Sequence, residues 1–378
     1  MKLKTVLFPL VGAYLLACSS KQQPTQQQEI DQTVEIIHRV NDYWQKAHPQ
    51  PDSYQWNYAV YHTGNMEAFF LTGDSAYYNY SLAWAEHNEW KGAKSDNKEE
   101  WIYSHGDSEE CVLFGDNQTC FQTYYDLYML APDPQKVARA REVMEYEMST
   151  DANDYWWWAD GLYMVMPVMT KYYKLTQNPL YLEKLYEYWS YTNSIMYDEE
   201  SGLYYRDAKY VYPKHQSVNG KKDFWARGDG WVMAAFAKVL KDLPTDDTHR
   251  TEYLTYYRKQ AAAIAACQQS DGYWTRSLLD PEQAPGPETS GTAFFTYGLL
   301  WGMNNGLLDK ATYEPVVRKA WNYLSTVALQ PDGRVGYVQP IGEQAIPGQV
   351  VDANSTADFG VGAFLLAACE MVRFLQAE

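Results

Sequence analysis

Residues 156–167 read Trp-Trp-Trp-Ala-Asp-Gly-Leu-Tyr-Met-Val-Met-Pro, so that one carboxylate lies between three tryptophans and an apolar run. The run from Leu162 to Met169 is apolar on every side, which is typical of a helix that is buried all round. This pattern predicts an inner layer of helices, with Asp160 at the mouth of one of them. Because Asp before an apolar run is also a common helix N-cap, a purely structural role for Asp160 stays open.

Apolar residues recur at helical spacing along most of the chain, and the alternation typical of strands is scarce. Two kinds of turn repeat, for example at residues 71–74 and 270–274, and together they delimit a helical hairpin. At about 50 to 60 residues per hairpin, the chain holds roughly six. We therefore expect an all-α (α/α)6 barrel, a toroid of six hairpins. A helical solenoid is the alternative, but it would not explain why aromatic and acidic residues collect at the same end of successive units.

The N-terminus has the features of an export signal. Lys2 and Lys4 precede an apolar segment that is too short to span a bilayer, which is typical of a signal peptide over residues 1–17. The motif Leu-Leu-Ala-Cys at residues 15–18 resembles the lipobox of bacterial lipoproteins. The resemblance implies cleavage before Cys18 and lipidation of its thiol.

A polar, glutamine-rich stretch follows the lipobox and predicts a flexible tether over residues 18–33. No second linker occurs downstream, so we expect one folded domain over residues 34–378. The protein would then lie outside the cytoplasm, in the periplasm or at the cell surface, and a lipid anchor would be its only link to a bacterial membrane.

The composition narrows the class of ligand. The formal charge of −17 argues against nucleic acid or an anionic membrane surface as a partner. The chain is 16% aromatic, with 14 Trp and 34 Tyr, and aromatic rings stack on the C–H faces of sugars. The CxxC, HExxH, P-loop and GxGxxG patterns are absent, so we expect neither a metal nor a cofactor. Cys111 and Cys120 flank a short loop, and a disulfide between them is one option in an oxidising compartment.

Three further stretches place polar groups at helix starts: residues 114–119 with Asp116, residues 224–231 and residues 288–294. In the second stretch Arg227 lies between two tryptophans, an arrangement that suits a sugar ring carrying a carboxylate. The alternative for Arg227 is a salt bridge to Asp229 or to another acid.

These motifs together resemble the unsaturated uronyl hydrolases of glycoside hydrolase families 88 and 105, especially the unsaturated rhamnogalacturonyl hydrolases of family 105. They are Trp-Ala-Arg-Gly-Asp-Gly-Trp at residues 225–231, Asp-Gly-Leu-Tyr-Met at 160–164 and Ser-Gly-Thr-Ala at 290–293. The resemblance implies an (α/α)6 catalytic domain over residues 34–378. The expected substrate is an anionic oligosaccharide from a polysaccharide lyase, from which the enzyme removes a terminal 4,5-unsaturated uronic acid.

The resemblance places the catalytic aspartate at Asp160 and the supporting one at Asp116. Two positions depart from it, because many members have Asn where this chain has Asp229, and His where it has Arg206. We expect the substrate to contact a set of further side chains: Trp158, Arg206, His215, Trp225, Arg227, Trp231 and Thr292.

The expected chemistry is hydration of an enol ether. Asp160 would protonate C4 and then, as a carboxylate, take a proton from the attacking water, so it must begin protonated. Its indole surroundings and the like charge of Asp116 would both raise its pKa. Two alternatives stay open, namely an inverting glycosidase on the same barrel that acts on intact glycan, and a non-catalytic glycan-binding lipoprotein.

Overall fold

The computed structural model describes Met1 and residues 24–377, and this part of the chain contains twelve α-helices. Their bounds are α1 Gln26–Ala47, α2 Trp56–Thr72, α3 Ser75–His87, α4 Cys120–Leu130, α5 Gln135–Met148, α6 Ala159–Thr176, α7 Leu180–Met196, α8 Ala226–Asp242, α9 Arg250–Ala266, α10 Thr289–Asn304, α11 Lys310–Tyr323 and α12 Asp358–Gln376. The shorter elements are η1 Lys98–Glu100, η2 Gly115–Gln118, η3 Leu324–Ala328 and the antiparallel pair β1 Tyr197–Asp198 and β2 Leu203–Tyr204.

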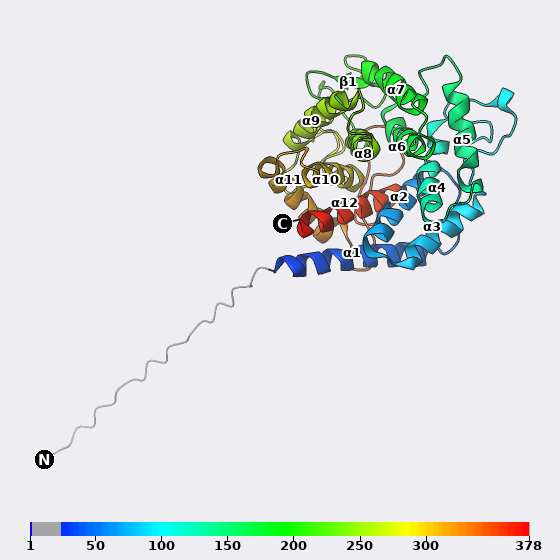
Figure 1. The fold of residues 1–378 in the computed structure, drawn as a ribbon. Helices are drawn as coiled ribbons and strands as arrows, with labels where there is room; N and C mark the ends of the chain where they lie inside the picture. The colour runs from blue at the N-terminus through cyan, green and yellow to red at the C-terminus, as the bar shows by residue number, and fades with distance from the viewer. Residues whose placement is uncertain (2–23, 378) are drawn as a thin grey trace.

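The helices form two concentric rings, as Figure 1 shows. The even-numbered helices make the inner ring, in which each packs against its two even-numbered neighbours and α12 closes on α2. Each odd-numbered helix packs outside an inner one, for example α7 on α6 and α9 on α8. The predicted (α/α)6 barrel is therefore confirmed, and the solenoid alternative is wrong because the ring closes.

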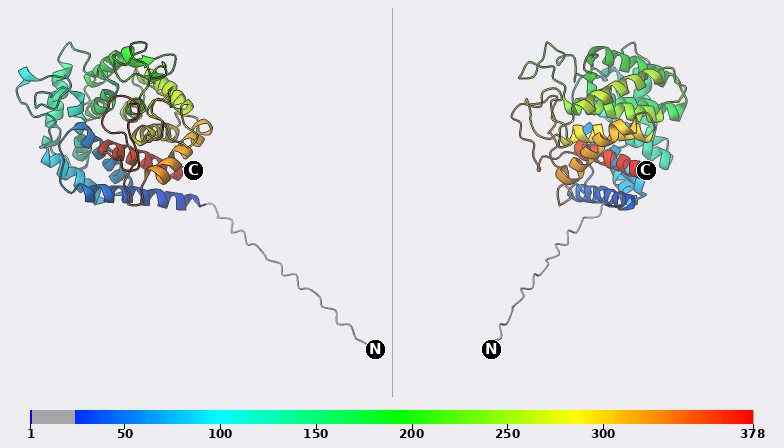
Figure 2. Two further views of the ribbon diagram at one scale, coloured as in Figure 1. Left: turned by 180° about the vertical axis from the view of Figure 1, so that it is seen from behind. Right: turned by 90° about the vertical axis from the view of Figure 1, so that its left-hand side faces the viewer.

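Sequence composition decides which ring a helix joins. In α8 every residue from Ala226 to Leu240 is buried, so this helix has no face for water. By contrast, α9 buries only a stripe at helical spacing, which includes Tyr253, Tyr257 and Ile264. Inner helices alternate with outer ones that run back, so all six inner helices begin at the same end of the barrel. Figure 2 gives two further views of this arrangement.

The first helix begins earlier than the sequence suggested. Thr25 and Gln28 form a capping box, and α1 begins at Gln26 inside the stretch 18–33 that was predicted to be a tether. The Gln26 amide donates a hydrogen bond of 2.5 Å to the carbonyl of Leu375, which fixes this start against α12. The flexible-tether prediction is therefore wrong for residues 26–33, because glutamine is a good helix former. The predicted signal peptide and Cys18 lie outside the described residues.

Two other expectations concern the cysteines and the membrane. Cys111 and Cys120 are both free buried thiols, so the disulfide option is not realised in this structure. Among residues 24–377, no helix combines the length and the apolar character that a membrane crossing needs.

The connections between hairpins close over the starts of the inner helices. The N–H of Ala159 donates to the carbonyl of Arg206 at 2.7 Å, and one hairpin later the N–H of Ala226 donates to the carbonyl of Arg276 at 2.8 Å. Free N–H groups at a helix start need partners, and here the following loop supplies one. This repeated contact brings Arg206 to the mouth of α6, where the site is built.

Candidate active site

Asp116 and Asp160 lie close together because the indole of Trp158 packs between two glycines. The indole of Trp158 packs over Gly115 and Gly161, where an added Cβ would lie 3.3 and 3.4 Å from the ring. Asp116 follows the first glycine in η2, and Asp160 precedes the second in α6. The absence of side chains at both glycines lets η2 approach the start of α6. Trp158 is only 1% exposed and packs against the glycines beside both aspartates, and its contact with the substrate stays a prediction.

Asp160 lies in the first turn of α6 and is 8% exposed. The residue at the N-cap is Trp158, so the prediction of Asp160 as the cap is wrong. Burial raises the pKa of Asp160, whereas the guanidinium of Arg206 lowers it. The Nε of Arg206 lies 3.3 Å from Oδ2 of Asp160 without forming a hydrogen bond. The carboxyl group therefore keeps a free oxygen for the substrate.

Asp116 holds a proton more firmly than its neighbour. Burial and the negative charge of Asp160 raise its pKa well above the usual range, and the more distant charge of Arg206 only partly opposes them. The sequence predicted this like-charge coupling between Asp116 and Asp160, and the guanidinium of Arg206 in addition lowers the pKa of Asp160. Two coupled carboxyl groups in such a site retain one proton between them to higher pH than an isolated acid would.

Arg206 is the guanidinium that reaches the mouth of the site, with 11% of its side chain exposed. Its Nη1 lies 2.7 Å from Asp207 and 3.4 Å from Glu343, and its Cζ lies 5.8 Å from the centre of the Trp157 ring. Sequence reasoning missed both acids. Asp207 directly follows the predicted Arg206, which was a usable signal. Glu343 lies in the aperiodic loop before α12, where the sequence offered none.

Arg227 is buried, and the protein engages its terminal nitrogens, whereas its Nε has no hydrogen-bond partner. It is 0% exposed, and its guanidinium lies 4.6 Å from the ring centres of both Trp225 and Phe359. It donates to the carbonyls of Gln339 at 2.6 Å and Pro340 at 2.8 Å. Its terminal nitrogens hold the loop before α12, and its contact with the substrate stays a prediction.

The alternative predicted for Arg227 was a salt bridge to Asp229 or to another acid, and the structure shows the second of these. The nearest carboxylate is Glu288, 4.0 Å from Nη1 of Arg227. Glu288 is itself buried and accepts hydrogen bonds from the N–H groups of Ser290 and Gly291, so it caps α10. It also accepts from the N–H of Gln339 at 3.0 Å, which ties the same loop to the barrel. Glu288 thus holds the loop rather than the substrate.

Asp229 lies between the rings, in the first turns of α8. It accepts hydrogen bonds from the N–H of Tyr204 at 2.9 Å and from the Gln260 amide at 3.1 Å. Burial raises the pKa of Asp229 to about 8, so this residue is protonated and neutral at pH 7. A neutral Asp has nearly the shape and charge of Asn. This explains how Asp229 stands where many resembling sequences have Asn.

The remaining predicted contacts have structural roles. Trp231 is 0% exposed and packs on Tyr163 and Phe294, and its contact with the sugar stays a prediction. Thr292 is also 0% exposed and accepts a hydrogen bond from the N–H of Trp274.

Trp225 and His215 are also engaged by protein. Trp225 is 3% exposed and donates from Nε1 to the Gln339 side chain at 2.8 Å, so it holds the loop, and its contact with the sugar stays a prediction. The Nε2 of His215 lies 3.0 Å from Asp223, which is itself bound by Ser277 and not by any residue of the Asp160 cluster. The ring of His215 lies 4.9 Å from that of Tyr210, and its contact with the substrate stays a prediction.

The inner helices give the site a positive field. Their starts are adjacent, since Trp56 of α2 stacks on Phe359 of α12, and Gly291 of α10 packs against Ala226 of α8. Each helix start carries about half a positive charge from aligned peptide dipoles. An anionic sugar thus meets Arg206 and several helix starts, although the chain as a whole carries −17.

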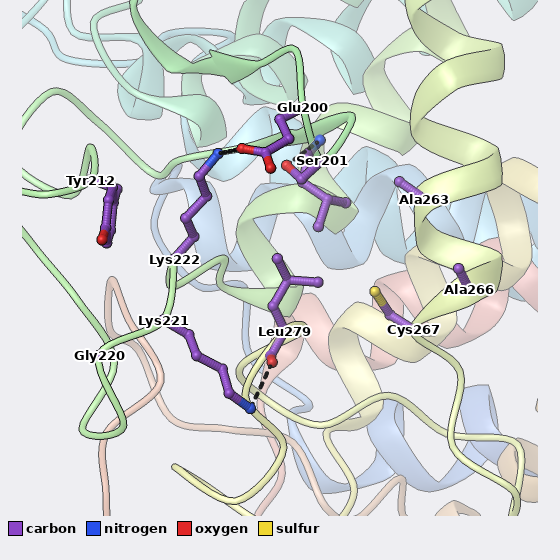
Figure 3. A pocket seen from close by; sticks show the side chains of 11 residues that line it. Glu200, Ser201, Tyr212, Gly220, Lys221, Lys222, Ala263, Ala266, Cys267 and Leu279 are labelled. Carbon is purple, nitrogen blue, oxygen red and sulfur yellow. Dashed lines mark hydrogen bonds and ion pairs between the residues drawn. The ribbon is translucent and has the colours of Figure 1, made fainter.

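A separate cavity of 760 Å³ lies between the β1–β2 hairpin, the loop before α8 and the end of α9 (Figure 3). Its lysines are already paired, Lys222 with Glu200 and Lys221 with the carbonyl of Leu279. Its walls hold no pair of carboxyl groups. We therefore assign the chemistry to the Asp116 and Asp160 cluster.

Comparisons with known proteins agree with this site. The profile of Glycosyl Hydrolase Family 88 matches residues 30–375. An unsaturated 3S-rhamnoglycuronyl hydrolase of Formosa agariphila is 35% identical over 345 residues, which cover 87% of this chain and 88% of the relative.

Two solved structures are closely similar. A glycosyl hydrolase family 88 protein from Bacteroides vulgatus has a TM-score of 0.90 at 66% identity and covers 91% of this chain and 99% of its own. A protein described as a polysaccharide lyase has a TM-score of 0.91 at 71% identity and covers 93% of this chain and 99% of its own. The chain is a glycosidase and belongs to glycosyl hydrolase family 88.

Proposed function

We propose that this enzyme removes a 4,5-unsaturated uronic acid from the non-reducing end of lyase-generated oligosaccharides by hydrating the C4=C5 enol ether. One observation carries the proposal: two buried carboxyl groups with raised pKa values lie beside the partly exposed guanidinium of Arg206. The carboxyl pair supplies a proton near neutral pH, and the guanidinium pairs with the uronate.

The reaction needs one group that is an acid and then a base. Asp160 donates a proton to C4, and positive charge develops at C5 beside the ring oxygen. Water adds to C5 and gives its proton to the Asp160 carboxylate. The resulting hemiketal opens, the anomeric carbon becomes an aldehyde, and the rest of the oligosaccharide leaves as an alcohol. Atoms balance with one water consumed and the acid restored.

Substrate binding prepares Asp160 for this role. Without substrate, Arg206 lowers the pKa of Asp160, while burial and the charge of Asp160 raise the pKa of Asp116, so that the pair shares a proton. A uronate carboxylate that binds Arg206 competes with the Asp160 carboxylate for the positive charge of the guanidinium. The pKa of Asp160 then rises, and the shared proton moves to the oxygen that faces C4.

The finer substrate class rests on relatives. The Formosa agariphila relative is named for unsaturated 3S-rhamnoglycuronyl substrates, and we infer that this chain takes an unsaturated glucuronyl or rhamnogalacturonyl unit. The test is the absorbance of the enol ether during incubation with lyase products of ulvan, rhamnogalacturonan, pectin and glucuronate-capped arabinogalactan. Decay on at least one substrate supports the proposal, and no decay on any of them contradicts it.

A polysaccharide lyase is the second candidate, because the structure that is 71% identical carries that description. A lyase removes the C5 proton with a base and creates the double bond, so absorbance would rise on intact polysaccharide. The sign of the absorbance change therefore separates the two functions. An inverting glycosidase or a binding protein would give no change.

We also propose that Cys18 is lipidated, so that residues 18–25 separate a membrane from α1 outside the cytoplasm. The lipobox motif at residues 15–18 supports this. Metabolic labelling with a radioactive fatty acid should mark the full chain and not its Cys18→Ser variant. Equal labelling of the two would contradict the anchor.

A further inference from the structure

A second cavity adjoins the carboxyl pair. Its volume is 470 Å³, within the range of small-molecule sites, and its lining is Trp101, Ile102, Tyr103, Ser104, His105 and Trp157. Trp157 forms a wall common to both places, because its ring lies 5.8 Å from Cζ of Arg206 and 4.6 Å from the ring of Trp158. We call this cavity the Trp157 groove. One indole separates it from the Arg206 that contacts Asp160.

The groove is held in a fixed shape. Ile102 donates its backbone N–H to the carbonyl of Glu110 at 2.9 Å and accepts from the N–H of Leu113 at 3.1 Å. The hydroxyl of Tyr103 donates to Asp154 at 3.0 Å, and the Trp101 indole donates to the carbonyl of Ser95 at 2.9 Å. Such preorganisation lowers the entropic cost of binding.

The polarity of the oligosaccharide, from its non-reducing to its reducing end, identifies which sugar can occupy the Trp157 groove. An unsaturated uronate ends the chain on its non-reducing side, so any further sugar must lie on the reducing side. The groove shares the Trp157 wall with the site of the carboxyl pair and is walled by aromatic rings, which suit the C–H faces of a sugar. It is therefore placed to take the sugar that leaves.

The charge of the lining residues further limits the class of sugar that the Trp157 groove can bind. Of the six lining residues only His105 can carry a positive charge. The cations nearest to Trp101 are committed, since Lys98 and Arg139 both pair with Glu142. The chain that follows the groove is acidic, with Asp107, Glu109 and Glu110. A sulfate or carboxylate in the groove would lose water without gaining a partner.

We propose that the Trp157 groove binds an uncharged sugar on the reducing side of the scissile bond, so that the enzyme selects lyase products whose second residue carries no sulfate. This inference rests on the proposed function and deepens it. It also separates this chain from relatives that are named for sulfated substrates.

The test compares kcat/KM on two pairs of unsaturated disaccharides, from ulvan and from chondroitin, each with and without sulfate on the second sugar. The wild type should prefer the unsulfated member. Ile102→Lys places a cation at a groove position that is 42% exposed, and it should raise the ratio of sulfated to unsulfated kcat/KM by about fivefold, the effect of one exposed ion pair. Met129→Lys makes the same charge change at a 56% exposed position outside the groove, and it should leave the ratio unchanged.

Each outcome is decisive. A wild type that prefers the sulfated member, or an Ile102→Lys variant whose ratio equals that of Met129→Lys, overturns the groove assignment while the function stands. A wild type that hydrates none of the four disaccharides refutes the proposed function on these linkages, and the inference fails with it.

Discussion

Replacing Asp229 by Asn should change how stability depends on pH. The pKa of Asp229 is about 8 in the folded protein because of burial, and about 3.9 in an unfolded chain. Between these values, unfolding of the wild type releases a proton from Asp229. The free energy of unfolding therefore falls as pH rises through this window, by about 1.4 kcal/mol per pH unit. The amide of the Asp229→Asn variant carries no such proton.

The difference in the free energy of unfolding between the variant and the wild type isolates the effect of Asp229 from that of all other titrating groups. Below about pH 4 both side chains are neutral in both states, so the two proteins should differ by about 1 kcal/mol or less. At pH 7 the variant should be more stable by about 2–4 kcal/mol, and above about pH 8 the gain should level off.

Urea unfolding followed by tryptophan fluorescence at several pH values measures the difference. The matched control is Asp271→Asn, which makes the same chemical change on the surface and should show no trend with pH. A difference for Asp229→Asn that stays flat from pH 4 to pH 8, or a variant that is less stable throughout, would refute the reasoning.

Three further predictions concern the site. Arg206→Gln removes the charge that lowers the pKa of Asp160, so the alkaline limb of the kcat/KM profile should move up by about 1–3 pH units while KM rises about tenfold or more. The control variant Arg206→Lys keeps the charge and should move the limb less. An unmoved limb in Arg206→Gln contradicts the pairing of Arg206 with Asp160. Glu343→Gln removes a carboxylate that lies 3.4 Å from Arg206 and competes with the substrate for this guanidinium, so KM should fall by up to about fivefold. A raised KM would show that Glu343 helps substrate binding instead. Gly115→Ala places a Cβ 3.0 Å from Val165 and 3.3 Å from Trp158, so η2 must shift. The kcat should then fall about tenfold to a hundredfold, with little change in the melting temperature. An unchanged kcat would mean that Asp116 need not be held so closely.

Periodicity was enough to predict the barrel. The run from Leu162 to Met169 shows that α6 has no wet face, and a helix of this kind needs an outer layer around it. The two aspartates were also readable, because each adjoins a glycine at a helix start. The first turn of α1 was misread because glutamines suit both a tether and a helix, and only the contact with Leu375 decides between them.

The binding residues were less predictable, because burial depends on distant parts of the chain. Trp225 and Arg227 look like a carboxylate clamp until Gln339 and Pro340, from a loop more than a hundred residues later, occupy them. The importance of Glu343 follows from the same loop, whose sequence has no period. Arg206 was found because it departs from a pattern, and the structure gives it the position that Arg227 was expected to hold.

The central claim is that Asp160 protonates an enol ether. The most direct measurement is the enol-ether absorbance during incubation of the purified wild type and the Asp160→Asn variant with the same unsaturated oligosaccharide. The account predicts steady decay with the wild type and at least about a thousandfold slower decay with Asp160→Asn, because an amide cannot deliver the proton to C4. Near-normal decay with the variant would contradict the account, and absorbance that rises on intact polysaccharide would identify a lyase.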